Sequence, residues 1–400
     1  MNRTPRILMF ATLVNTIGNG AYLTTSALFL TRSVGLSTGQ VAAGLSAAAF
    51  AGMVLSTPMG YVVDRLGAKR VQLAALLGNA LCFAGLTRVH GVWAYAMIAC
   101  LIAVGDATVK AANGALIAAA VPAGERVRTR AFLRSTSNAG IAIGTLAGGV
   151  PLALDSRAGY VAVLLGNAAS FLIAFAVIMC IRDAAPVAAP AGGPRMVALR
   201  DRPFMAFALV DGLTAALYNE ITSLALPLWL VTYTHAPVTL VSVALLINTV
   251  GCVTLQVWAA RGTETAAAAI PVARRGALVV AAACVLFGLT AHRTSWLVVA
   301  LVVAASVVHV LGELWLSSAT GAVVFDLAPE WAQGQYQAAQ QTGRQIGNLA
   351  APPILTGLVI GLGAAGWLGV AAIFAAAGWL VPAIVRHRLT AAPASADAVA

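Results

Sequence analysis

The sequence predicts an all-helical integral membrane protein with twelve transmembrane helices in two related halves. Of its 400 residues, 60% are hydrophobic and only 9% are charged, whereas a water-soluble domain carries far more charge on its surface. Apolar runs of about 20 residues, each long enough to cross the hydrocarbon layer as a helix, recur from end to end. A short repeat also relates the first six runs to the last six. Lipid is therefore the solvent for most of the chain.

Short polar turns separate the twelve apolar runs, and each run is taken as one span. The run 276–291 is short for a span. No small-residue cleavage site follows the first run, so it is retained as a span rather than a signal peptide. The expected spans are 7–30, 39–59, 71–87, 93–120, 131–154, 158–181, 204–231, 238–260, 276–291, 296–327, 336–361 and 364–385.

Basic residues are distributed unevenly between the two sides of the predicted membrane. The formal net charge is +11, with 24 Lys and Arg. With the N-terminus inside, 17 of these residues lie in cytoplasmic segments, four in outer loops and three within spans. This asymmetry places both termini in the cytoplasm, and it explains the charge without nucleic-acid binding. A composition rich in Ala and Arg, with only two Lys, is typical of GC-rich bacterial genomes and favours a bacterial inner membrane.

The longest polar interruption has six spans on each side and is interpreted as a linker. It is rich in Ala, Pro and Gly, a composition typical of flexible connections, and we expect disorder between Pro190 and Pro194. The expected organisation is an N-terminal half 1–181, a cytoplasmic linker 182–203, a C-terminal half 204–385 and an unstructured cytoplasmic tail 386–400. The five cysteines all lie in spans without C-x-x-C spacing, so we expect no disulfide, metal site or cofactor.

The turn between the second and third spans reads Gly60-Tyr61-Val62-Val63-Asp64-Arg65-Leu66-Gly67-Ala68-Lys69-Arg70. Its two glycines remove the side chains that would block an immediate reversal. Its basic residues remain on the cytoplasmic side, and its single carboxylate can pair with them or face a helix N-terminus. The predicted conformational gate comprises Gly60, Asp64, Arg65, Gly67, Lys69 and Arg70.

The pattern of this turn, G-x-x-x-D-R-x-G-x-K-R, resembles the loop between the second and third helices of the major facilitator superfamily of secondary transporters. The resemblance implies two pseudo-symmetric six-helix bundles around a central cavity, with spans one, four, seven and ten lining the substrate pathway. It also implies that Asp64 lies at the N-terminal end of span eleven, near Gln335 to Gln340, and holds the outward-open state through the helix dipole. The equivalent loop of the second half, 261–275, has no Asp-Arg pair, so any second gate is built differently.

An internal repeat supports the two halves. Spans five and eleven both contain G-x-x-[IV]-G-[TN]-L-A, offset by 203 residues, as expected for duplicated transporter halves. Glycines spaced by four form a flat stripe on which another helix can pack. The stripe in span five also resembles the G-x-x-x-G-P-x-x-G-G motif of drug–proton antiporters, with Thr145 in place of Pro, which favours antiport. The predicted packing residues are Gly140, Gly144, Gly148, Gly149, Gly343 and Gly347.

Four polar stripes at helical spacing lie on spans one, four, seven and ten. Each has a purely structural alternative: hydroxyls can bond their own helix backbone, and Asp106 and Lys110 can pair only to neutralise one another. A cavity lined by Tyr22 and Tyr218 of these stripes, together with Trp229 and Trp315, would suit an amphipathic or cationic compound. The predicted cavity residues are Asn15, Asn19, Tyr22, Asp106, Lys110, Asn113, Tyr218, His309 and Glu313.

Ionisable residues inside a membrane span are expensive and mark functional sites. Glu313 has no basic residue within one turn except His309, and desolvation there favours its neutral, protonated form. Asp211 is nearer the cytoplasmic end, and Glu220 lies nine residues further on, on the opposite side of a straight helix, although Pro227 leaves its direction open. The predicted proton-coupling residues are Glu313, Asp211 and Asp106, in that order.

The function expected from these features is proton-driven export of a small organic compound by a monomer. The alternative is import of a sugar, amino acid or organic acid, with Lys110 and Arg344 as anion contacts. A membrane enzyme is disfavoured because the five His are scattered and catalysis needs its groups within hydrogen-bond reach. The chain also has no G-x-x-x-x-G-K-[ST] phosphate loop. The expected partners are the substrate, protons and the lipid bilayer, with no nucleic acid.

Overall fold

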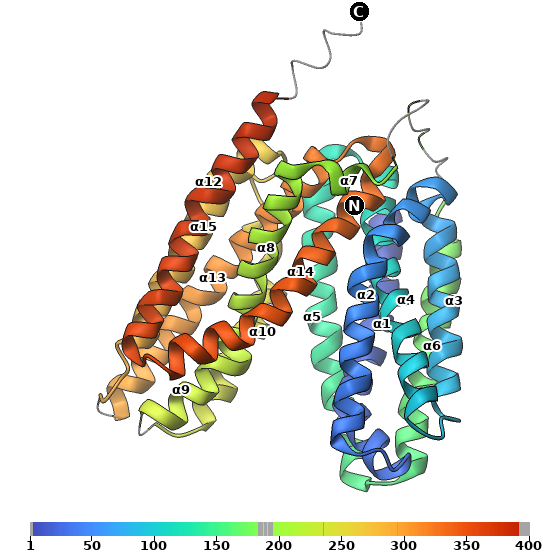
Figure 1. The fold of residues 1–400 in the computed structure, drawn as a ribbon, viewed down its shortest axis with the longest axis horizontal. Coiled ribbons are helices and arrows are strands. Elements are labelled where there is room, and N and C mark those ends of the chain that lie inside the picture. Colours follow the sequence, from blue (N-terminus) through green and yellow to red (C-terminus); the bar gives the residue numbers. More distant parts are fainter. Residues whose placement is uncertain are drawn as a thin grey trace, which may run out of the picture. The chain divides into compact units, whose positions relative to one another are not determined.

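The computed structural model describes residues 3–182, 187, 190, 195–234, 236–293 and 295–391 (Figure 1). The expected disorder at 191–194 and the tail from 392 lie outside these residues. The chain forms two compact units. Each unit contains a short segment whose sequence neighbours belong to the other: 123–131 in unit 2 and 329–341 in unit 1. Unit 1 comprises Met1–Pro122, Phe132–Val197 and Pro329–Gln341, and unit 2 comprises Ala123–Ala131, Ala198–Ala328 and Thr342–Ala400.

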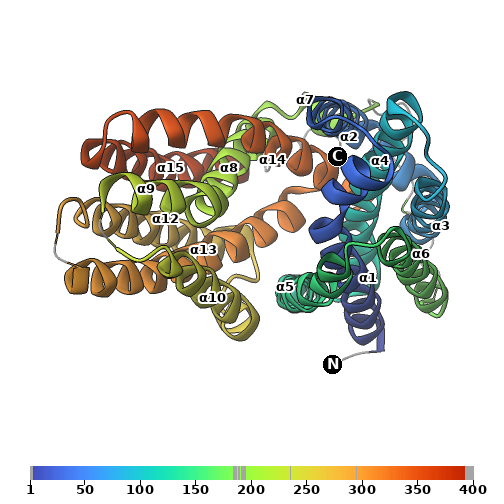
Figure 2. The same ribbon diagram turned by 90° about the horizontal axis from the view of Figure 1, so that it is seen from below.

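Unit 1 is a bundle of long helices in which α1 packs on α6, α2 on α4, and α3 on both α4 and α6 (Figure 2). Local signals define the helix ends. Ser37 and Gln40 form a capping box that begins α2, and Gly67, at φ 94°, permits the direct turn from α2 to α3. The helices are α1 (Arg3–Leu28) with a π-helical turn (Phe29–Ser33), α2 (Thr38–Leu66), α3 (Ala68–Leu86), α4 (Val92–Ala120), α5 (Ala123–Leu154) and α6 (Arg157–Met179).

Unit 2 is built around α12, which packs on α13 and α15. Asp201 caps the start of α8 through the backbone N–H of Phe204, and its carboxylate accepts a 3.1 Å bond from Arg388 near the end of α15. The helices are α7 (Val197–Arg200), α8 (Arg202–Glu220), α9 (Leu226–Tyr233), α10 (Thr239–Thr254), α11 (Gln256–Ala259), α12 (Ala266–Gly288), α13 (Ser295–Leu327), α14 (Gln333–Leu355) and α15 (Ala364–Ala391), with π-helical turns at Ile221–Ala225 and Thr356–Ile360. The start of α14, up to Gln341, belongs to unit 1.

The all-helical membrane fold is confirmed, and every expected span falls on a helix or on helices joined end to end. Nine of the described helices are long and apolar enough to cross a membrane, and α10 is a shorter apolar helix. Four expected boundaries differ from the helix ends by six residues or more. Helix α2 ends at Leu66 rather than 59, and α5 begins at Ala123 rather than 131. Helix α12 begins at Ala266 rather than 276, and α15 ends at Ala391 rather than 385. Each of these helices continues beyond the apolar run into more polar sequence, and Ala and Arg, which are strong helix formers, support the added turns.

A π-helical turn at Ile221–Ala225 divides the expected seventh span into α8 and α9. Pro227 follows at the first turn of α9, where its missing N–H costs least. Glu220 lies before the interruption and accepts a 2.9 Å hydrogen bond from Ser223. Asp211 is buried on the other side of the same helix, so these two acids have separate surroundings.

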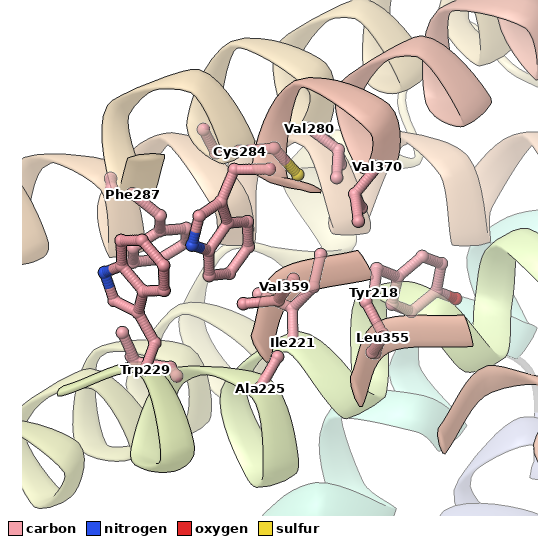
Figure 3. Close-up of a cluster of buried hydrophobic side chains, with 14 of the residues drawn as sticks. Tyr218, Ile221, Ala225, Trp229, Val280, Cys284, Phe287, Leu355, Val359 and Val370 are labelled. Carbon is pink, nitrogen blue, oxygen red and sulfur yellow. The ribbon is translucent and has the colours of Figure 1, made fainter. Parts of the chain in front are cut away.

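An aromatic cluster forms part of the core of unit 2 (Figure 3). Trp229 is fully buried, stacks on Tyr233 with ring centroids 4.5 Å apart and meets Trp367 edge to face at 5.8 Å. Its indole N–H donates a 2.7 Å bond to Thr290. The expectation that Trp229 lines a substrate cavity was wrong, because its ring surface and its polar atom are both used in the core.

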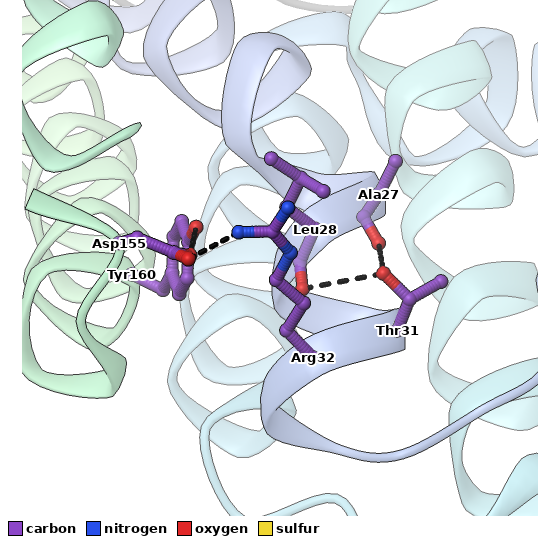
Figure 4. Close-up of polar contacts among 6 residues, drawn as sticks. All are labelled: Ala27, Leu28, Thr31, Arg32, Asp155 and Tyr160. Carbon is purple, nitrogen blue, oxygen red and sulfur yellow. Dashed lines mark hydrogen bonds and ion pairs between the residues drawn. The ribbon is translucent and has the colours of Figure 1, made fainter. Parts of the chain in front are cut away.

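A polar cluster joins the end of α1 to the turn between α5 and α6 (Figure 4). Arg32 forms an ion pair with Asp155, which also accepts a 2.5 Å bond from Tyr160. This bond, together with the Arg32 charge, holds the pKa of Asp155 below its usual range. The ion pair therefore contributes stability above the ordinary carboxyl pKa and loses it only as the pH falls through the lowered value.

Glycine stripes allow close helix contacts inside both units. In unit 1, Gly140, Gly144 and Gly148 of α5 face the backbone and threonines of α1. In unit 2, Gly343 and Gly347 of α14 face the backbone of α8. Gly149 differs from the other predicted packing residues, since no described atom of another helix lies within 4 Å of a Cβ placed there. It follows Gly140 by nine residues, which places it on the opposite side of the helix.

These contacts give a matched stability prediction. We expect Gly144→Ala to lower the free energy of unfolding by about 1–3 kcal/mol, because the new methyl would overlap the backbone of Ile17. Gly149→Ala should instead be neutral or raise stability by up to about 1 kcal/mol, from the higher helix propensity of Ala. Thermal unfolding of the two purified variants measures the difference. Equal stability would contradict the packing role of Gly144.

Candidate functional site

A pocket of about 440 Å³ lies inside unit 1, within the usual size range of small-molecule sites. Helices α1 and α4 supply most of its polar groups, and α3, α5 and α6 supply the remaining wall. The predicted cavity residues that line it are Asn15, Asn19, Tyr22, Asp106, Lys110 and Asn113. The other three, Tyr218, His309 and Glu313, belong to unit 2.

The polar stripe on α1 divides between two roles. Thr16 donates to the carbonyl of Thr12 at 2.8 Å and so bonds its own helix. The amides form a chain instead: Asn167 donates to Asn19 at 3.2 Å, and Asn19 donates to Asn15 at 3.3 Å. Both kinds of residue line the pocket, but the Thr16 hydroxyl bonds its own helix backbone whereas the amides bond one another. Asn167 on α6 was missed, since it is a single amide in an apolar run.

Asp106 has a partner that the spacing on its own helix did not suggest. Its carboxylate accepts a 2.7 Å hydrogen bond from Asn79 of α3, which is almost completely buried. Within the described residues, no ion pair joins Asp106 to Lys110, although both line the pocket. The expected pairing along α4 is thus replaced by a bond between two helices, and the Lys110 ammonium remains on the pocket wall.

Glu313 lies on α13, is only 3% exposed, and is held by groups of α10. Its carboxylate accepts a 2.7 Å bond from Asn248 and lies 3.7 Å from the Cys252 sulfur. The sequence indicated only His309 near Glu313, whereas the structure adds two neutral contacts from another helix. Asn248 and Cys252 share one face of α10, four residues apart, but a lone Asn among apolar residues gives no signal of the acid that it contacts.

The other predicted groups of unit 2 are also buried. His309 is completely buried one turn before Glu313, and Tyr218 is 2% exposed in the hydrophobic core. Asp211 accepts a hydrogen bond from Thr320 of α13. It lines a cavity of about 20 Å³, which is room for about one water molecule.

The residues of the predicted gate do not share one set of contacts. The Asp64 carboxylate accepts hydrogen bonds from the backbone N–H groups of Gly334 and Gln335, at 2.6 and 3.0 Å. These amides lie in the first turn of α14, where the helix dipole favours an anion. Gly60 of α2 faces Gly334 of α14. A Cβ on Gly60 would overlap the carbonyl of Gly334, and a Cβ on Gly334 would overlap the carbonyl of Gly60. Asp64 and the two glycines therefore form one joint inside unit 1.

The basic gate residues have other surroundings. Lys69 donates a 2.6 Å bond to the carbonyl of Ile181, just beyond the C-terminal end of α6, where a cation is favoured. Arg65 is exposed and lies 5.5 Å from the centre of the Tyr61 ring. Arg70 is exposed as well. Neither Arg65 nor Arg70 takes part in the Asp64 joint.

Comparison with known proteins identifies the family. The model of the Major Facilitator Superfamily matches residues 8–352. No curated protein matches the sequence. Solved structures share the fold at low identity. The human organic anion transporter MFSD10 is 15% identical with a TM-score of 0.69, covering 94% of this chain and 98% of that one.

Two further structures give the same result. A bacterial homologue of the iron transporter ferroportin is 15% identical with a TM-score of 0.75, covering 97% of this chain and all of that one. The Escherichia coli fucose:proton symporter is 16% identical with a TM-score of 0.69, covering 96% and 98%. The family model, which spans most of the chain, shows a multi-pass secondary transporter and not an enzyme. The solved structures show that the fold extends over nearly all of the chain. The chain belongs to the major facilitator superfamily.

Proposed function

We propose that this transporter exports a small organic compound in exchange for protons, by alternating access of the halves 1–181 and 204–385. It works as a monomer in the inner membrane of a bacterium, with both termini in the cytoplasm. The observation that carries the proposal is Glu313, a carboxylate that is only 3% exposed on a long apolar helix and accepts a hydrogen bond from Asn248. A buried acid in a span is a functional group by default, because burial of its charge is costly.

In this mechanism Glu313 is protonated from the outside and releases its proton to the cytoplasm. The Asn248 amide donates a hydrogen bond to the Glu313 carboxylate, which supports the charged form after the proton leaves. Asp211, with its Thr320 bond and its adjoining water-sized cavity, is the second candidate, and Asp106 is the third. Substrate binds in the unit 1 pocket, whose amides, acid and apolar wall suit an amphipathic compound.

The direction of transport rests on the α5 stripe. Gly140, Gly144 and Gly148 pack directly on α1, a pocket-lining helix, in a pattern that resembles that of drug–proton antiporters. The Asp64 joint supplies the gate: two backbone amides hold the carboxylate in one state of the cycle, and transport requires their release.

Import of a small metabolite is the second candidate, favoured by one observation. Lys110 lines the pocket without an ion-pair partner among the described residues, so an organic acid could bind to it. Drug accumulation in cells separates the two candidates, because only an exporter lowers it.

Inside-out vesicles with an acidic lumen test the proposal directly. Export corresponds to uptake of a fluorescent amphipathic drug into the lumen, and it should stop when the pH gradient is collapsed. A panel of drug susceptibilities with and without expression identifies compounds to use. Uptake that is indifferent to the gradient, with unchanged susceptibility to every drug, would exclude proton-driven export.

A further inference from the structure

The unit 1 pocket contains two opposite charges that do not neutralise each other by contact. Asp106 and Lys110 lie four residues apart on α4, which places their Cβ atoms about 5–6 Å apart. Yet the Asp106 carboxylate is bonded to Asn79, and no ion pair joins it to Lys110 in the described residues. If Asp106 and Lys110 served only to neutralise each other, we would expect a direct ion pair between them. Here both charges line the pocket.

Three amide side chains that line this pocket, one each from α1, α3 and α4, have polar atoms without a hydrogen-bond partner among the described residues. These are the Asn15 Nδ2, the Gln72 Oε1 and the Asn113 Oδ1. Gln72 is 2% exposed, so solvent does not compensate its carbonyl. Buried polar atoms are nearly always hydrogen-bonded in native proteins, and a set that includes a donor and two acceptors around one pocket indicates a ligand that both accepts and donates.

The remaining wall is apolar and aromatic. Leu76, Phe83 and Ile102 are buried in it, and Tyr22 meets Phe83 edge to face at 4.9 Å. A strongly hydrophilic ligand would not bury this apolar surface favourably, whereas a ligand with an apolar body would remove it from water.

We infer that the pocket recognises an amphipathic zwitterion, a molecule with one ammonium, one carboxylate and an apolar body. The carboxylate binds Lys110, the ammonium binds Asp106, and the unpartnered amides bind the remaining hydrogens and lone pairs. A simple cation would be repelled by Lys110, and a simple anion by Asp106. This inference rests on the proposed function only in that the pocket is taken as the substrate site, and its volume accommodates an apolar amino acid or a dipeptide.

The test is equilibrium binding to the purified protein in nanodiscs, without any gradient. The probes are apolar amino acids and dipeptides, L-phenylalanine first, each with its methyl ester and its N-acetyl derivative. At least one zwitterion should bind about tenfold more tightly than either derivative, as expected for loss of one charged contact. Asp106→Asn should abolish the preference over the N-acetyl form, and Lys110→Gln the preference over the ester.

Charge-deleted controls are available in the same unit. Arg32→Gln and Asp155→Asn remove a cation and an anion from the ion pair at the end of α1, outside the pocket, and should leave every preference unchanged. Asn at position 106 can still accept the Asn79 bond. If Asp106→Asn nevertheless fails to fold, Lys110→Gln tests the inference by itself. It should abolish the preference for the zwitterion over its methyl ester and leave the preference over the N-acetyl form unchanged.

Two results would overturn the inference: no zwitterion in the panel binds better than both of its derivatives, or each variant weakens all three forms equally. Failure of the proposed export is a separate outcome. Zwitterion binding without gradient-driven uptake in vesicles would reject proton antiport and retain the substrate class. Gradient-driven drug uptake without a preference for zwitterions would retain proton antiport and reject the substrate class.

Discussion

Replacing Asp64 by Asn is expected to slow transport at least about tenfold, with little change in substrate affinity. Hydrogen bonds to a charged group contribute about 1.5–3 kcal/mol, and each 1.4 kcal/mol is tenfold in an equilibrium. The Asp64 carboxylate accepts two such bonds from the start of α14, and Asn loses the charge and one good acceptor. The state that depends on this joint becomes less populated, while the pocket residues are untouched. Initial rates in proteoliposomes and equilibrium binding on the same preparation measure both quantities.

Two variants sharpen this prediction. Arg65→Gln removes the neighbouring charge, but Arg65 is exposed and contacts Tyr61, so its effect on rate should be under about twofold, as for most exposed substitutions. Gly334→Ala keeps the Asp64 charge and places a methyl against its carboxylate and the Gly60 carbonyl, so it should reproduce the defect. An Asp64→Asn protein that transports at the normal rate, or that loses binding in proportion to rate, rules out a gating role.

Hydropathy predicted the number and order of the helices but not their ends. An apolar run marks the part of a helix that lies in the hydrocarbon layer, and the helix itself can continue beyond the edge of that layer. The start of α12 illustrates the difference: Thr265 caps it through the N–H of Ala268, eleven residues before the apolar run at 276. Pro271 and the following arginines lie inside the helix. The cap was visible in the sequence, but the apolar run gave the stronger signal.

The candidate site was predictable where its residues repeat along one helix. The amides of α1 and the charges of α4 do so, and they meet in one pocket. The partners that orient them were not predictable. Asn79 and Asn248 are the only Asn residues of their helices, and their roles come from packing against α4 and α13. Trp229 shows the opposite error, since an aromatic residue on a pathway helix was assigned to a cavity although it packs in the core.

Glu313→Gln is the second substitution with a large expected effect. Gln has nearly the shape of Glu and can keep the bond from Asn248, but it carries no proton between the two sides. In inside-out vesicles, a gradient of one pH unit supplies about 1.4 kcal/mol per proton, which supports up to about a tenfold concentration ratio for one-for-one exchange. We expect this ratio to fall to about one in the variant, while counterflow of substrate down its own gradient continues.

The contrast between driven accumulation and counterflow separates proton coupling from folding. A misfolded protein loses both activities, whereas a carrier without its proton site loses only the first. Glu220→Gln is the matched control, because Glu220 lies beside Ser223 on the more exposed side of α8 and should couple normally. Asn248→Leu should weaken accumulation without abolishing it, since one hydrogen bond to the charged carboxylate is lost. If Glu313→Gln accumulates substrate as well as the native protein does, then the proton is carried elsewhere, and Asp211, in its bond with Thr320, becomes the residue to replace next.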